Sequence, residues 1–119
     1  MDYIVSSAVL LSLDAVYISA TKGFYGSLVN GIQKTKMQVK TFAVIATYVM
    51  LLFGYYALII SKRRTPQEAA ILGVTIYGVF ELTNYAIFKN WSIFAVIMDT
   101  LWGGFLLYLT TVITYFFIK

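Results

Sequence analysis

The sequence predicts an all-α protein that forms a bundle of four membrane-spanning helices. Of its 119 residues, 61% are hydrophobic and only 12% are charged, whereas an ordinary soluble domain has about 25% charged residues. The mean hydropathy is +0.82. Because one bilayer-spanning helix needs about 20 mostly apolar residues, the chain has room for four such helices and little else. We therefore expect residues 1–119 to form a single integral membrane domain.

The first apolar run covers residues 3–21, and Asp14 is its one charged residue. The small hydroxyl residues in this run are tolerated by helices that lie in lipid. Residues 22–40 contain four lysines and three glycines and are too polar to span a bilayer. Their mixture of lysines with apolar side chains suits a loop with a short interfacial helix after the first span.

The second span covers residues 41–61, which carry no charge and end against Lys62, Arg63 and Arg64. Such a basic tract at the end of an apolar run is typical of a helix that leaves the bilayer beside the lipid phosphates. The lysines and arginines are divided almost evenly between the two sides of the predicted bundle. The orientation of the chain in the membrane is therefore left open.

The third span covers residues 66–88 and has a clear start signal. Thr65 suits the N-cap, Pro66 the first helical position, and Glu68 completes a capping box. Residues 89–92 then form a tight connection with an interfacial tryptophan, and Ser92 caps a fourth span over residues 93–118. Glycines in the last three spans are expected to let neighbouring helices approach closely; these are Gly54, Gly73, Gly78, Gly103 and Gly104.

Three acidic residues interrupt the apolar spans: Asp14, Glu81 and Asp99. Each lies about eight positions from the first or the third loop, which is roughly 12 Å at 1.5 Å per residue. With four spans these two loops share one side of the membrane, so the three carboxyl groups fall in one layer. Because each ionisable group at the centre of a bilayer costs about 2.5 to 3.5 kcal/mol, we expect the three to converge inside the bundle.

Helical spacing places polar partners on the same faces as the acids. Tyr77, Asn84 and Tyr85 share a face with Glu81, while Trp102 follows Asp99 and Tyr17 follows Asp14. Three clustered carboxyl groups with little water should not all ionise, because desolvation and mutual repulsion both oppose it. We expect at least one proton on the cluster unless a cation is bound. The candidate residues for a polar, proton or cation site are Asp14, Glu81, Asn84 and Asp99, supported by Tyr17, Tyr77, Tyr85 and Trp102.

The composition also narrows the chemistry. Cysteine and histidine are both absent, which removes thiolate and imidazole metal ligands and the usual proton shuttle. No nucleophile motif, phosphate-binding loop or cofactor fingerprint occurs, so no catalytic residue, metal or cofactor is predicted. The net charge of +4 comes from short basic tracts beside apolar runs. These tracts suit anionic lipid headgroups better than nucleic acid.

The order of these residues resembles a family of small membrane proteins catalogued as domain of unknown function 2177. The likeness covers nearly the whole chain and rests on an acidic residue before Tyr17 and on the segments GFY (23–25), ELTNYAIFKNW (81–91) and MDTLWGG (98–104). The matching positions are Asp14, Phe24, Tyr25, Glu81, Leu82, Thr83, Asn84, Trp91, Asp99, Trp102 and Gly103. The chain departs from the family at Glu81, where aspartate is typical, and at Tyr17, where tryptophan is common. The resemblance implies a four-span membrane protein and assigns no biochemical activity.

Three functional hypotheses follow from these residues. The first is a structural or accessory membrane component, either a homo-oligomer or a subunit of a larger membrane complex, in which the acids are satisfied by tyrosine, tryptophan and asparagine. The second is proton or cation binding and translocation through Asp14, Glu81 and Asp99. The third is a membrane-embedded enzyme or binder of a lipid-like small molecule, with a pocket walled by aromatic rings. A polar cavity that reaches one surface distinguishes the later hypotheses from the first.

Overall fold

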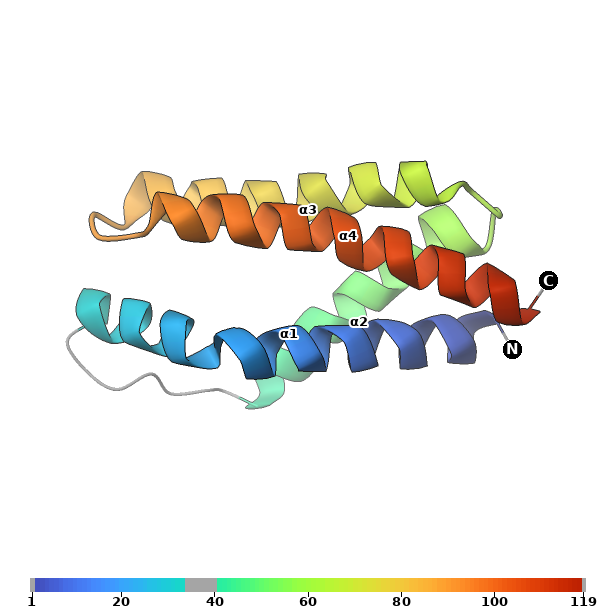
Figure 1. Ribbon diagram of the computed structural model, residues 1–119, viewed down its shortest axis with the longest axis horizontal. Coiled ribbons are helices and arrows are strands. Elements are labelled where there is room, and N and C mark those ends of the chain that lie inside the picture. The colour runs from blue at the N-terminus through green and yellow to red at the C-terminus, as the bar shows by residue number, and fades with distance from the viewer. Residues whose placement is uncertain (1, 34–40, 119) are drawn as a thin grey trace.

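Four long antiparallel helices make up the computed structural model of the protein, which describes residues 2–33 and 41–118. They are α1 (Asp2–Gln33), α2 (Thr41–Tyr55) with its continuation η1 (Tyr56–Ile60), α3 (Pro66–Ile87) and α4 (Ile93–Ile118). Each of the four is long and apolar enough to cross a membrane. Both chain ends lie at the same end of the bundle (Figure 1). The described part contains no β-strand, so the predicted all-helical fold class is confirmed.

The first helix is longer than the sequence pattern suggested. It continues through residues 22–33, where we expected a loop with a separate interfacial helix. No proline interrupts this stretch, and a glycine costs a helix only about 1 kcal/mol relative to alanine, so Gly23 and Gly26 are accommodated within α1. Residues 34–40, the remainder of the expected loop, lie outside the described residues.

The second helix ends in a widened turn. In η1 the N–H of Ser61 donates to the carbonyl of Tyr56 at 2.8 Å, the i to i−5 pattern of a π-helix. The turn buries Ile59 and Ile60. The chain then reverses through Arg63, which has a positive φ of 52°, and the Tyr115 hydroxyl of α4 donates to the Arg64 carbonyl at 2.6 Å. The far end of α2 is thereby fixed to the bundle.

The third helix begins at Pro66 with the capping box that the sequence predicted. The Thr65 hydroxyl accepts the N–H of Glu68 at 3.1 Å, and the Glu68 carboxylate accepts the N–H of Thr65 at 3.0 Å.

Replacing Thr65 with alanine removes the hydroxyl that accepts the Glu68 N–H and should lower the free energy of unfolding by about 1 kcal/mol. Denaturant titration followed by circular dichroism measures this. Thr75→Ala is the control, because the Thr75 hydroxyl bonds only to the carbonyl of Ile71 in its own helix; equal losses in the two variants would contradict the cap.

Helices α3 and α4 form the closest pair in the bundle. An added Cβ on Gly73 would collide with the backbone of Gly103, and one on Gly103 would collide with the ring of Tyr77. The glycines thus let the two helices meet backbone to backbone, as expected for small residues in membrane helices. Gly54 does not share this role, because a Cβ there would meet nothing within 4 Å.

The first part of α2 is the element that packs least. In Figure 1 it crosses obliquely behind α1 and α4, and its side chains in residues 41–45 are exposed. Its middle packs partly against the core through Tyr48, Leu51 and Leu52, and its buried residues, Tyr55, Ile59 and Ile60, lie at the far end. The fully buried side chains Leu10, Leu106 and Leu107 belong to the same core. The bundle is therefore close-packed at the end that carries the termini and looser toward the other end.

Candidate functional site

The three acids of the spans are all brought toward the interior. Asp14 of α1 and Glu81 of α3 are only 5% and 1% exposed, and Asp99 of α4 is half-buried. All three line one cavity. Glu81 and Asp99 lie at similar distances along α3 and α4 from the connection that joins these helices. Asp14 reaches the same cavity through the packing of α1 on α4, although the loop at residue 22 from which its depth was counted is part of α1.

Aromatic donors hold Asp14 from two sides. The indole Nε1 of Trp102 donates to Oδ1 of Asp14 at 2.9 Å, and the Tyr48 hydroxyl of α2 donates to its Oδ2. Both carboxyl oxygens thus have a partner, which offsets much of the cost of burying the group. Trp102 was predicted to support the acids. Tyr48 was missed because span two has no charge, although its distance from the start of that span matches the depth of the acids.

A second group of donors serves Asp99 and Glu81. The Tyr17 hydroxyl donates to Oδ1 of Asp99 at 3.1 Å, and the indole of Trp91 donates to Oε1 of Glu81 at 2.8 Å. The Glu81 and Asp99 carboxyl groups line the same cavity. Trp91 was expected only at the membrane interface. Its place directly after α3 lets its ring fold back over the last turns of that helix.

The two groups are joined by a stacked pair of rings. Tyr17 and Trp102 lie parallel, with an interplanar angle of 3° and centroids 4.5 Å apart. Tyr17 bonds Asp99 while Trp102 bonds Asp14, so the pair links both aspartates through side chains of α1 and α4. With Tyr48 included, these side chains connect α1, α2 and α4, and Glu81 of α3 lines the same cavity.

Three of the residues predicted for the site do not line the cavity: Asn84, Tyr85 and Trp102. Trp102 still takes part in the site through its hydrogen bond to Asp14. Asn84 is half-buried and Tyr85 is exposed, and both are about one turn closer to the end of α3, where Trp91 supplies the donor to Glu81 instead. Tyr77 does line the cavity. Tyr25 lines it as well; its position in the GFY segment was the only signal for it, because the sequence pattern placed that segment in a loop.

The cavity has a volume of about 890 Å³ and receives lining residues from all four helices. Its inner end is formed by the acids and their aromatic partners. Its outer rim is apolar and includes Met50 of α2 and Phe80 of α3, both exposed. The first part of α2, where residues 41–45 are exposed, crosses α1 and α4 obliquely (Figure 1) and contributes Val44, Ala46 and Thr47 to the lining. The site therefore joins a polar interior to an apolar outer surface.

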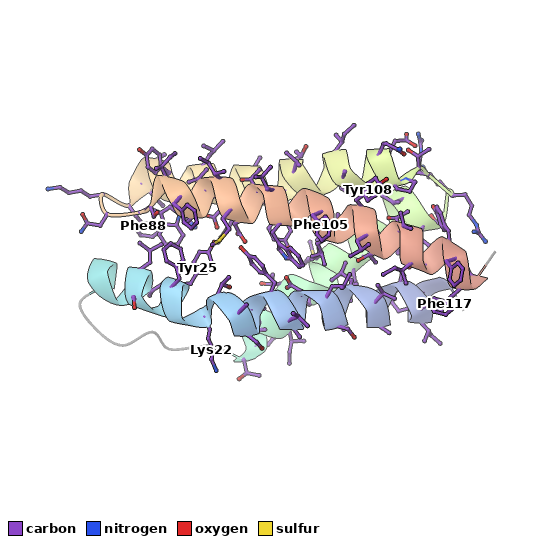
Figure 2. All side chains as sticks on the ribbon, viewed as in Figure 1. Lys22, Tyr25, Phe88, Phe105, Tyr108 and Phe117 are labelled. Carbon is purple, nitrogen blue, oxygen red and sulfur yellow. The ribbon has the colours of Figure 1, made fainter. Side chains whose placement is uncertain are left out.

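No basic side chain pairs with the acids in the described part of the chain. Lys22 lies at the edge of the cavity but is exposed, and Figure 2 shows its side chain directed away from the bundle. Lys89 is exposed on the connection between α3 and α4. Among the described residues no three acids come close enough to hold a metal ion together. In this part of the chain the recorded donors to the three acids are the neutral groups of tyrosine and tryptophan.

The comparisons with known proteins agree with this architecture. No curated protein and no solved structure matches the chain significantly. The model of one family, described as a predicted membrane protein (DUF2177), matches residues 1–116. Four helices of membrane-spanning length and composition within the matched range fit that description. The match covers nearly all of the chain, and the protein therefore belongs to the DUF2177 family of membrane proteins.

Proposed function

We propose that this protein binds an amphipathic small molecule that reaches it from the bilayer. The observation that carries the proposal is the cavity of about 890 Å³, which connects buried carboxyl groups to an apolar rim on α2 and α3. Binding pockets for small molecules have volumes of about 300 to 1,000 Å³ and mostly apolar walls with a few polar groups. The apolar part of the ligand lies between α2 and α3, and its polar end reaches the acids.

The shape of the cavity supports binding over conduction. The lining residues lie around the acids and toward the end of the bundle where residues 88–92 connect α3 to α4. Toward the termini, Leu10, Leu106 and Leu107 are fully buried in the core. A proton or cation pathway needs a continuous polar route to both surfaces. The leucines interrupt such a route, so a pocket open at one end is the better supported function.

The alternative to ligand binding is that the acids have a purely structural role. The hydrogen bonds of Asp14 and Glu81 would also serve to hold the helices together. Interhelical hydrogen bonds in bilayers contribute only about 0.6 kcal/mol on average. Adhesion alone explains neither the cavity beside these bonds nor the apolar rim on α2, and these two features support a ligand.

Ligand binding is testable by tryptophan fluorescence, because both tryptophans of the chain lie at the site. Trp91 lines the cavity and Trp102 bonds Asp14. For the protein in phosphatidylcholine nanodiscs, titration with dodecanol and with dodecylamine should give a saturable fluorescence change for at least one of the two. Absence of saturation with both would contradict the proposal.

A cavity-filling variant separates this site from general partitioning into lipid. Ala46 of α2 lines the cavity, so Ala46→Phe should weaken binding by about tenfold or more, which corresponds to about 1.4 kcal/mol. Ala86→Phe is the matched control, because Ala86 is exposed on α3 and does not line the cavity. Equal affinities for the two variants would place the probe elsewhere in the bilayer.

A further inference from the structure

We propose that the ligand of this cavity is a protonated amine on an apolar chain, whose ammonium group binds between Glu81, Asp99 and the hydroxyl of Tyr25. The inference rests on the proposed function and adds the charge of the ligand to it. Glu81 and Asp99 supply the negative charge, Tyr25 supplies a neutral acceptor, and the rim on α2 and α3 receives the apolar chain.

The first support is the charge of the cavity. Three acids line it, and in the described part of the chain neither Lys22 nor Lys89 forms an ion pair with them. Their recorded donors are the neutral groups of Tyr17, Tyr48 and two tryptophans. Buried carboxylates in a membrane require a counter-charge or a proton. An ammonium group supplies that charge together with N–H donors, and charge-assisted hydrogen bonds are about twice as strong as neutral ones.

The second support is the hydroxyl of Tyr25. Its oxygen is buried and makes no close hydrogen bond, although the Tyr17 hydroxyl lies near it. Figure 2 shows the Tyr25 side chain extending from α1 toward α4, away from the outer surface where Lys22 lies. A buried polar atom without a close partner is unfavourable. The lone pairs of this oxygen are suited to accept an ammonium N–H inside the cavity.

The third support is the aromatic wall. Tyr17, Tyr77 and Trp91 line the same cavity as the acids. Aromatic faces attract ammonium groups through the ring quadrupole, and the attraction grows when the cation is desolvated. A neutral alcohol gains little from these rings beyond contact area. The wall and the acids therefore favour the same class of ligand.

Proton release follows from the placement of Glu81 and Asp99 in one cavity. Two carboxyl groups that share a site with little water oppose each other's ionisation, so one of them keeps a proton when no counter-charge is bound. An ammonium group supplies that counter-charge and removes the need for the proton. The other titratable groups that line the cavity are on α1, α2 and α3: Asp14, Tyr17, Tyr25, Tyr48 and Tyr77, with Lys22 at the edge and directed away from the bundle. We therefore expect amine binding to displace one proton and to weaken as the pH falls.

The test compares three probes with the same chain in the nanodisc assay: dodecylamine, dodecyltrimethylammonium and dodecanol. Dodecylamine should bind at least about tenfold more tightly than dodecanol. It should also bind more tightly than dodecyltrimethylammonium, which has no N–H to donate to Tyr25. If one proton is released, the affinity for dodecylamine should fall by up to about tenfold per pH unit on acidification. The amine itself stays protonated between about pH 6 and pH 8, so this dependence reports on the protein.

Substitutions test which residues cause the preference for the amine. In the Glu81→Gln, Asp99→Asn double variant, the preference for dodecylamine over dodecanol should fall to the value found for the lipid nanodisc without protein. The pH dependence of dodecylamine binding should disappear. Tyr25→Phe should weaken dodecylamine several-fold and leave dodecanol unchanged. Glu68→Gln is the matched control, since Glu68 lies at the start of α3 beside Arg64 and does not line the cavity. It should keep the full preference.

The outcomes separate the two proposals. If dodecanol and dodecylamine bind equally well to the native protein, the inference of an amine ligand is wrong, while the proposed binding of an amphipathic molecule remains supported. If the quaternary probe binds as tightly as the primary amine, the hydrogen bond to Tyr25 is excluded. If the preference survives in the double variant, Glu81 and Asp99 are not its source and the inference is wrong. If no probe binds, the proposed function fails together with the inference.

Discussion

Replacing Gly73 with alanine is expected to force α3 away from α4 and to lower the free energy of unfolding by about 1 to 3 kcal/mol, the usual cost of overpacking. The added Cβ would collide with the carbonyl of Gly103 and would come within 3.1 Å of the Cα of Gly104. Both obstacles are backbone atoms, so no side-chain rotation relieves the clash. The two helices must separate along the length over which they now touch.

The measurement is unfolding by sodium dodecyl sulfate in mixed micelles, followed by circular dichroism. Gly54→Ala is the matched control, because a Cβ at Gly54 meets nothing within 4 Å. The two variants make the same chemical change in a spanning helix, and they differ only in what lies opposite. Equal stabilities would show that the close contact between α3 and α4 does not exist in the membrane.

Replacing Trp102 with alanine is expected to have the second large effect on stability, a loss of about 3 kcal/mol. The change removes the ring stacked on Tyr17 and the donor to Asp14 at once. Phe105→Ala provides the comparison. Phe105 is one turn away on α4, touches Trp102, and is more than half exposed. Its truncation should cost much less, because little of its surface is buried against protein.

Trp102→Phe separates the two contributions. Phenylalanine keeps a ring beside Tyr17 but gives no N–H to Asp14, so we expect a loss of about 0.6 to 1.7 kcal/mol, the range for interhelical hydrogen bonds in bilayers. The same change made in an Asp14→Leu background should cost measurably less, because the acceptor is gone. If the cost is unchanged in that background, the bond between Trp102 and Asp14 contributes nothing to stability.

The sequence was sufficient for the properties that depend on position along each helix. The apolar runs determined where α3 and α4 lie, and the Thr65 to Glu68 capping box located the start of α3. The distance of Glu81 and Asp99 from the connection between α3 and α4 followed from counting residues, because the rise of an α-helix is nearly constant. The count for Asp14 began from a loop at residue 22, where α1 in fact continues. The long α1 was the exception: its lysines and glycines suggested a loop, yet none of them prevents a helix from continuing.

The tertiary structure decided the properties that depend on how the helices rotate and tilt against one another. The glycine contact between α3 and α4 sets the direction in which Glu81 and Asp99 face, and the oblique course of α2 brings Tyr48 to Asp14 while it opens the cavity beside Met50. Apolar side chains all around a spanning helix make every rotation equally soluble in lipid. The pattern of hydrophobicity therefore predicts how deep a residue lies in the membrane but not which way its side chain faces. Only packing between helices selects which polar groups meet.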